Sequence, residues 1–200
     1  MVPAHVKQHE TSAVVIGASA GGIDALTRIL PGLSADARLP FIVVVHLPPT
    51  KPSLLVDVFA PRCRLPVREP FDKQPIEPGI WVAPPDYHIL VEAGAKGHTF
   101  AMSVDEPVNF SRPSIDVLFE SAAETYGARL TAVVLTGASR DGADGARRVR
   151  EMGGTVYVQD PRGAEVEIMP RAAIAASSPQ LIAPLESLAK TLHDISRGTP

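Results

Sequence analysis

The fold class follows from the stretch AVVIGASAGG at residues 13–22. Its apolar, β-branched start predicts a buried parallel strand, and the small residues after it predict a tight turn into a helix. The apolar residues at helical spacing in that helix are Ile23, Leu26, Ile29 and Leu30. A strand that ends in a glycine-rich turn before a helix is the start of an α/β fold.

Two further segments repeat this pattern, FIVVVHLPP at residues 41–49 and LTAVVLTGASRDG at residues 130–142. The three turns carry Ser19, His46 and Asp141. Loops at the carboxyl ends of parallel strands converge on one crevice, so residues far apart in sequence can meet there. We therefore predict a hydrolytic triad, with Ser19 as nucleophile, His46 as base and Asp141 as the acid that orients the base.

The rest of the chain continues the alternation of strands and helices. Helices are expected at about 54–60, 111–126, 143–152 and 169–176 and from 184 onward, strands at 80–83 and 155–158, and a β-hairpin between 88 and 104. This order predicts a mostly parallel sheet covered by helices on both faces, with the hairpin as an antiparallel insertion. We expect one domain over residues 1–200, with a core from about 12 to 195 after a short polar tail.

Composition excludes several classes of protein. Of the 200 residues, 45% are hydrophobic and 20% charged, and the net charge of -3 gives no basic surface for nucleic acid. The single cysteine, Cys63, cannot form an internal disulfide, which fits a reducing compartment. No apolar stretch is long enough for membrane insertion, and the polar start is not a signal peptide, so we expect a cytoplasmic protein.

Ser19 stands in GASAG at residues 17–21, which fits the G-x-S-x-G pattern of a nucleophile elbow. The alternative is a glycine-rich turn that cradles a phosphate, with Ser19 only as a helix cap. A dinucleotide site would need Gly-x-Gly-x-x-Gly and an acidic residue at the end of the second strand. The chain has serine at position 19 and His46 at that strand end, which favours the esterase interpretation.

His46 also has a structural alternative, because a lone histidine at a strand end is often only a hydrogen-bonded part of the fold. Its place after the strand that follows the Ser19 turn favours a base, since imidazole titrates near neutral pH. His88 is the competing base, because the loop before it could approach the crevice.

The acid has alternatives as well. Asp141 or Ser139 could simply cap the helix that follows them, since both residue types are common at helix starts. Asp86 and Asp160 also lie near predicted strand ends and are weaker candidates for the acid.

The chain order Ser, His, Asp differs from the orders in α/β-hydrolases, chymotrypsin and subtilisin. From about residue 12 to about 176 the sequence instead resembles the catalytic domain of the CheB family of protein-glutamate methylesterases. The resemblance rests on IGASAGG (16–22), HLPP (46–49), VAPPDYH (82–88), RPSIDVLF (112–119), LTG (135–137), RDGA (140–143) and MPRAAI (169–174).

The resemblance implies a three-layer α/β/α, doubly wound fold and a serine esterase of bacterial chemotaxis that needs no metal or cofactor. Its substrate would be glutamate γ-methyl esters on chemoreceptor proteins, and receptor glutamines would be deamidated as well. Matched by motif, Ser19 is the nucleophile, His46 the base and Asp141 the acid.

The chain departs from the family pattern in two ways. It has TGAS at residues 136–139 where the family usually has Thr-Gly-Met-Gly, so we expect the oxyanion to be held by backbone N–H groups of Ala20 or His46 and of Ala138. Too few residues precede the first strand for the family's receiver domain, so regulation would need a separate partner. The alternative function is a catalytically weak, CheB-like regulatory or docking module.

Overall fold

The computed structural model describes residues 11–47, 53–95 and 97–198. Two residues of the expected HLPP motif, Pro48 and Pro49, and most of the expected polar tail lie outside the described residues.

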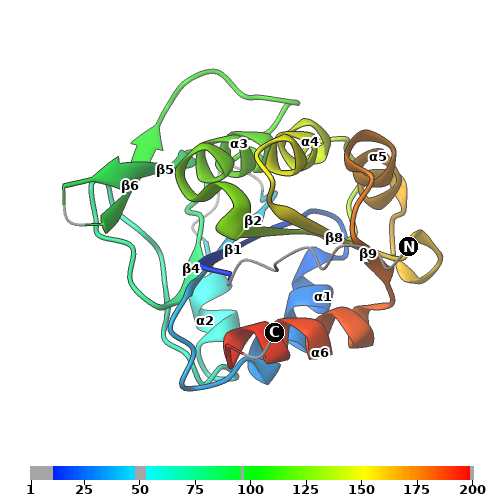
Figure 1. Ribbon diagram of the computed structural model, residues 1–200, viewed down its shortest axis with the longest axis horizontal. Coiled ribbons are helices and arrows are strands. Elements are labelled where there is room, and N and C mark those ends of the chain that lie inside the picture. Colours follow the sequence, from blue (N-terminus) through cyan, green and yellow to red (C-terminus); the bar gives the residue numbers. More distant parts are fainter. Residues whose placement is uncertain (1–10, 48–52, 96, 199–200) are drawn as a thin grey trace, which may run out of the picture.

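A seven-stranded sheet in the order β3-β4-β2-β1-β7-β8-β9 forms the centre of the molecule (Figure 1). Every pairing in it is parallel, which confirms the mostly parallel sheet expected from the apolar runs. The strands are β1 (Ala13–Ala18), β2 (Pro40–Val45), β3 (Val67–Arg68), β4 (Gly79–Val82), β7 (Leu130–Val134), β8 (Thr155–Gln159) and β9 (Leu181–Ala183).

Helices cover both faces of the sheet, as predicted, and give three layers (Figure 1). On one face lie α3 (Ile115–Tyr126), α4 (Ala143–Glu151) and α5 (Ile168–Ser177), and on the other α1 (Gly22–Ile29), α2 (Leu55–Phe59) and α6 (Leu185–Ser196). Short 3-10 turns follow α1 (Leu30–Gly32), α3 (Gly127–Arg129) and β8 (Pro161–Gly163).

The sheet divides the core in two, because successive side chains of a strand point to opposite faces. In β1, Val14, Ile16 and Ala18 pack on the α1 and α6 side, whereas Ala13 and Val15 pack on the α3 and α4 side. Leu26, Ile29 and Leu30 are buried as expected. Ile23, which has the same helical spacing, is 40% exposed.

The antiparallel hairpin is confirmed as β5 (His88–Gly94) and β6 (Gly97–Ser103). It is fastened to α3 by side chains of that helix. The Val91 N–H donates to Ser121 Oγ at 3.1 Å, and Thr125 Oγ1 donates to the Val91 carbonyl at 3.1 Å. The chain between β6 and α3 therefore starts and ends at fixed points, and this connection carries part of the site.

Helix starts differ from the sequence expectation by a few residues. α3 begins at Ile115 rather than near Ser111, because Ser114 is extended and its hydroxyl accepts from the Val117 N–H as the N-cap. α2 begins at Leu55, with Ser53 Oγ accepting from the Leu55 N–H at 3.3 Å. None of the helices in the described parts of the chain combines the length and apolar character that a membrane crossing requires.

Candidate active site

Ser19, His46 and Asp141 follow three neighbouring strands, β1, β2 and β7, and of these three side chains only His46 and Asp141 are joined by a hydrogen bond among the described residues. The His46 N–H donates to the Ala18 carbonyl at 3.2 Å, and the Ser19 N–H donates to the Thr136 carbonyl at 3.0 Å. Ser19 and His46 therefore follow the last paired residues of adjacent strands, Ala18 and Val45. By the alternation of each strand, both side chains continue on the face covered by α3.

His46 is hydrogen-bonded to Asp141, with Nε2 2.8 Å from Oδ2. The Asp141 side chain is fully buried, and the His46 side chain is 13% exposed. Because an ionised carboxylate only accepts hydrogen bonds, Nε2 must carry the hydrogen. The other ring nitrogen, Nδ1, is then the basic atom of the neutral ring.

Asp141 also closes the amino end of α3, far from it in sequence. Its carboxylate accepts from the backbone N–H groups of Ile115 at 2.6 Å and Asp116 at 3.2 Å. Further donors are Ser114 Oγ at 2.8 Å and Asn109 Nδ2 at 3.3 Å. Burial alone would raise the pKa of Asp141, yet the hydrogen bonds from His46, Ile115 and Ser114 outweigh burial and hold the pKa below its usual value. Asp141 is therefore a carboxylate at neutral pH.

The idea that Asp141 or Ser139 caps the following helix was wrong. The N-cap of α4 is Gly142, in the left-handed region, and no side chain caps it. Ser139 Oγ instead accepts from the Asp141 N–H at 3.3 Å. The Asp141 carboxylate instead accepts from His46 and from the first N–H groups of α3.

Glycine at position 17 lets α3 approach the end of β1. A Cβ there would lie 2.4 Å from Ile115 Cγ2, closer than any real contact. Gly142, at φ 94°, makes a similar approach, because a Cβ on it would lie 2.8 Å from the same methyl group. These two positions allow the Ile115 N–H to reach Asp141.

A second buried carboxylate, Asp116, lies beside Asp141 and was not singled out from the sequence. Its oxygens accept from the Gly145 N–H at 2.7 Å and from Asn109 Nδ2 at 2.7 Å. Burial raises the pKa of Asp116 to about 7. The negative charge of Asp141 acts in the same direction, and the hydrogen bond from the Gly145 N–H acts against it. Asn109 therefore joins the two carboxylates through one amide group.

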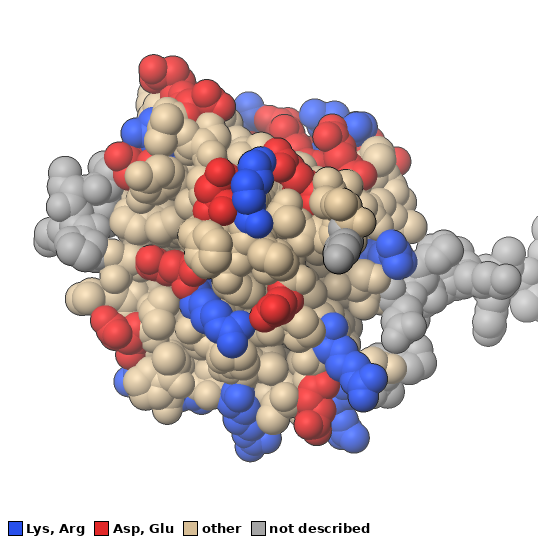
Figure 2. All heavy atoms as spheres, turned by 90° about the vertical axis from the view of Figure 1, so that its left-hand side faces the viewer, with Lys and Arg blue, Asp and Glu red and all other residues tan. Residues whose placement is uncertain are grey.

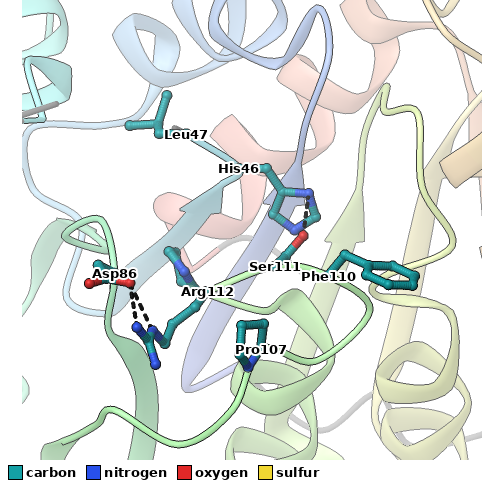
Figure 3. Close-up of a pocket in the computed structure, with 8 residues that line it drawn as sticks. His46, Leu47, Asp86, Pro107, Phe110, Ser111 and Arg112 are labelled. Atoms are coloured by element: carbon teal, nitrogen blue, oxygen red, sulfur yellow. Dashed lines mark hydrogen bonds and ion pairs between the residues drawn. The ribbon is translucent and has the colours of Figure 1, made fainter. Parts of the chain in front are cut away.

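A cavity of about 230 Å³ opens beside the imidazole (Figure 3). Ser111 Oγ lies in it, 3.4 Å from His46 Nδ1. The guanidinium of Arg112 spans the cavity wall and binds Asp86 Oδ1 at 2.6 and 2.9 Å. The lining residues are His46, Leu47, Asp86, Pro107, Phe110, Ser111, Arg112 and Pro113.

The alternative acids and base have other partners. Asp86 pairs with Arg112, and Asp160 pairs with Arg162 at 2.6 Å. His88 is buried, with Nδ1 accepting from the Ser114 N–H at 3.1 Å and Nε2 3.2 Å from the Glu106 carbonyl. Both nitrogens of His88 are thus used in holding the loop before α3, as in a structural histidine.

The candidate oxyanion donors divide into two groups. The His46 N–H is committed to the Ala18 carbonyl, so it cannot also bind an oxyanion. Within the described residues, the N–H groups of Ala20 and Ala138 donate no hydrogen bond, and Ala138 is exposed. The turn that carries Ala20 is held by the segment that follows β7, because Thr136 Oγ1 donates to the Ala20 carbonyl at 2.9 Å. Ala20 and Ala138 thus stay available for that role.

Charges of both signs are interspersed over the face that includes the β5–β6 hairpin (Figure 2). Several of the charged side chains are paired, among them Lys73 with Glu92 and Arg68 with Glu77. A surface of this kind offers no extended field of one sign to attract a highly charged polymer.

The comparisons with known proteins concern the family and the fold. The family model described as CheB methylesterase matches residues 14–192. The chain belongs to the CheB methylesterase family. The crystal structure of the Thermotoga maritima CheB methylesterase catalytic domain superposes on it with a TM-score of 0.88 at 31% identity, covering 94% of this chain and 100% of that one. The family resemblance and the three-layer fold expected from the sequence are thereby confirmed.

Curated relatives of this CheB-family chain have names that contain protein-glutamate methylesterase/protein-glutamine glutaminase. A Leptospira interrogans protein named "Putative protein-glutamate methylesterase/protein-glutamine glutaminase" is 45% identical over 179 residues, covering 89% of this chain and 91% of the relative. Protein-glutamate methylesterase/protein-glutamine glutaminase 2 of Caulobacter vibrioides is 41% identical over 188 residues, covering 93% of this chain and 54% of the relative. The chain thus spans about half the length of the Caulobacter protein.

Sequence analysis missed three polar residues around the His46–Asp141 pair: Asn109, Ser111 and Asp116. All three fall in NFSRPSID at residues 109–116, whose second half carries part of the family resemblance. The sequence pattern predicted only a helix start at Ser111 and gave Asn109 no role. The available signal was an unusual density of polar side chains just before and within the first turn of an otherwise apolar helix.

Proposed function

We propose that the protein is a serine esterase that hydrolyses glutamate γ-methyl esters on chemoreceptor proteins and also deamidates receptor glutamines. The observation that carries the proposal is the hydrogen bond from His46 to the buried carboxylate of Asp141, at the strand end next to Ser19. Family membership and the names of the relatives support the choice of substrate. The cytoplasmic helices of a chemoreceptor would be the protein partner.

In this mechanism Ser19 Oγ attacks the ester carbonyl carbon while His46 Nδ1 takes its proton. The backbone N–H groups of Ala20 and Ala138 stabilise the negative charge on the carbonyl oxygen. The tetrahedral intermediate then collapses. The proton on Nδ1 passes to the departing methoxide, which leaves as methanol, and the glutamyl group stays on Ser19 as an ester.

Asp141 acts through His46 rather than on the substrate. By accepting from Nε2 it keeps the proton off Nδ1 in the resting ring and stabilises the imidazolium that forms during attack. Its low pKa serves this role, because a neutral carboxylic acid would stabilise the imidazolium less.

Deamidation follows the same course with a different leaving group. A glutamine side chain presents the same carbonyl carbon, and His46 protonates its nitrogen so that ammonia leaves. Both reactions give the same glutamyl ester of Ser19, which water then hydrolyses to glutamate.

The alternative, a catalytically weak regulatory or docking module, is not favoured. Such a module has no need for a buried carboxylate held ionised by five donor groups, of which one is the imidazole. It also has no need for a cavity at the second imidazole nitrogen.

Methanol release from methylated chemoreceptor tests the proposal. We expect steady release by the wild type and none above background by Ser19→Ala, with the two thermal midpoints nearly equal because the serine is only partly buried. The control is Ser187→Ala, an exposed serine of α6 across the sheet, which should retain full activity. Full activity in Ser19→Ala would reject the proposed nucleophile, and no release by the wild type would reject the substrate.

A further inference from the structure

The Ser111 hydroxyl has an unusual position beside the basic nitrogen of His46. Its oxygen lies 3.4 Å from Nδ1 and 3.5 Å from the Asn109 carbonyl, and both distances are at the long limit for a hydrogen bond. Nδ1 of the neutral ring is an acceptor, and no donor group in the described parts of the chain reaches this oxygen. The hydroxyl thus keeps capacity both to donate and to accept.

The segment that carries Ser111 is rigidly placed. Val108 and Ser111 exchange two backbone hydrogen bonds, at 3.1 and 2.9 Å, around a turn in which Asn109 and Phe110 have φ values of 49° and 62°. The Asn109 amide anchors this turn to Asp116, at 2.7 Å, and to Asp141, at 3.3 Å. The hydroxyl of Ser111 is therefore fixed to the same network that fixes the imidazole.

The distance between the two groups suits a shared water molecule. Ser111 Oγ and His46 Nδ1 are 3.4 Å apart, so one water oxygen can lie about 2.8 Å from both atoms, which is an ordinary hydrogen-bond length. The adjoining cavity of about 230 Å³ has room for such a water and connects it to solvent. A water at that position would be hydrogen-bonded directly to Nδ1 of His46.

We propose that Ser111 is a positioning residue for deacylation, its hydroxyl holding the water that hydrolyses the glutamyl ester of Ser19. This inference rests on the proposed function. In the step, the water oxygen bonds to the ester carbonyl carbon and one water proton passes to His46 Nδ1. As the tetrahedral intermediate collapses, the bond to Ser19 Oγ breaks and the proton on Nδ1 returns to that oxygen. The products are the glutamate side chain and free Ser19.

Rapid acid quench separates the two half-reactions, acylation of Ser19 and hydrolysis of the glutamyl ester. The test compares Ser111→Ala with the wild type, using a receptor peptide that carries one glutamate γ-methyl ester. We expect the first equivalent of methanol to be released within about threefold of the wild-type rate. Later turnovers should slow by roughly 10–100-fold, the loss of one positioning hydrogen bond. Mass spectrometry should then find the glutamyl group accumulated on Ser19.

Two further measurements separate positioning from a general structural effect. Ser111→Thr keeps a hydroxyl at the same place and should restore most of the deacylation rate. Hydroxylamine attacks the glutamyl ester without needing Ser111 to hold it, so it should speed turnover of Ser111→Ala more than that of the wild type. Ser187→Ala is the control for serine removal away from the site and should match the wild type throughout.

Equal slowing of both half-reactions in Ser111→Ala, with no glutamyl-enzyme, would overturn the inference while leaving the esterase mechanism intact. Faster first turnover would overturn it too, because Ser111 would then compete with Ser19 for Nδ1. A wild type that releases no methanol would overturn the proposed function and with it this inference.

Discussion

The His46 imidazole and the N-terminus of α3 share one anchor, the carboxylate of Asp141. Oδ2 of Asp141 lies 2.8 Å from His46 Nε2 and 2.6 Å from the backbone nitrogen of Ile115. The acid of the proposed triad thus also accepts from the first two N–H groups of a 12-residue helix whose N-cap residue is Ser114. Any change at this carboxylate should therefore affect both catalysis and folding stability.

We predict that Asp141→Asn lowers kcat by roughly 10³–10⁴, because an amide favours the wrong imidazole tautomer. The substitution should also lower the free energy of unfolding by about 1–3 kcal/mol. The new NH₂ group would face N–H and O–H donors that now bind a carboxylate oxygen, and these donors would lose their acceptor. Steady-state methanol release and urea unfolding measure the two effects.

Asp86→Asn is the matched control, because Asp86 lies on the same cavity but binds Arg112 instead of His46. The Asp86 carboxylate is half exposed. Asp86→Asn should therefore lower the free energy of unfolding by no more than about 1 kcal/mol and kcat by less than about tenfold. If Asp86→Asn were the more damaging change, the acid would be misassigned.

Gly17→Ala should damage the site through packing alone. The added methyl group would lie 2.4 Å from Ile115 Cγ2, and α3 would have to move from the end of β1. We expect a loss of about 1–3 kcal/mol in stability, together with lower activity as the Ile115 N–H leaves Asp141. Gly32→Ala is the control, since a Cβ at Gly32 meets nothing within 4 Å. An unchanged thermal midpoint in Gly17→Ala would contradict the packing described for α3.

Asp116 should make stability fall as pH rises. Its folded-state pKa is raised to about 7, above the value of about 3.9 for an unfolded aspartate. The stabilisation is fully present below pH 4 and is lost as pH rises through 7. Asp116→Asn does not titrate, so the wild type should lose stability relative to this variant between pH 4 and 8, by on the order of 4 kcal/mol at most.

Urea unfolding of both proteins across that range measures the difference. Asp141 contributes in the opposite direction, because its pKa is lowered and its stabilisation is lost toward acid pH. A difference that stays flat with pH would mean that the Gly145 and Asn109 hydrogen bonds keep Asp116 ionised.

Much of the fold was predictable because long apolar runs decide the central strands. The runs that became β1, β2 and β7 are buried throughout. Ser19 and His46 directly follow β1 and β2, and Asp141 lies in the turn between β7 and α4. The edge strands β3 and β9 were missed. They have only two and three residues, too few for any periodicity, and they exist because a neighbouring strand offers free backbone groups.

The surroundings of the predicted triad were less predictable. That Asp141 would cap α3 rather than α4 depends on Gly17 and Gly142, which let two elements approach that are far apart in sequence. The position of Ser111 depends on a turn with two left-handed residues, Asn109 and Phe110, of which phenylalanine gives no signal for that conformation. Tertiary contacts decide both features, and local sequence patterns do not record them.

The site of labelling by a serine-directed fluorophosphonate tests the central claim most directly. Two serines lie near His46 in this structure, Ser19 at the adjacent strand end and Ser111, whose Oγ is 3.4 Å from Nδ1. The account predicts a single label on Ser19, found by peptide mass spectrometry, with its rate greatly reduced in His46→Ala and unchanged in Ser187→Ala. A label on Ser111, or a Ser19 that remains unlabelled in a protein active toward methyl esters, would contradict it.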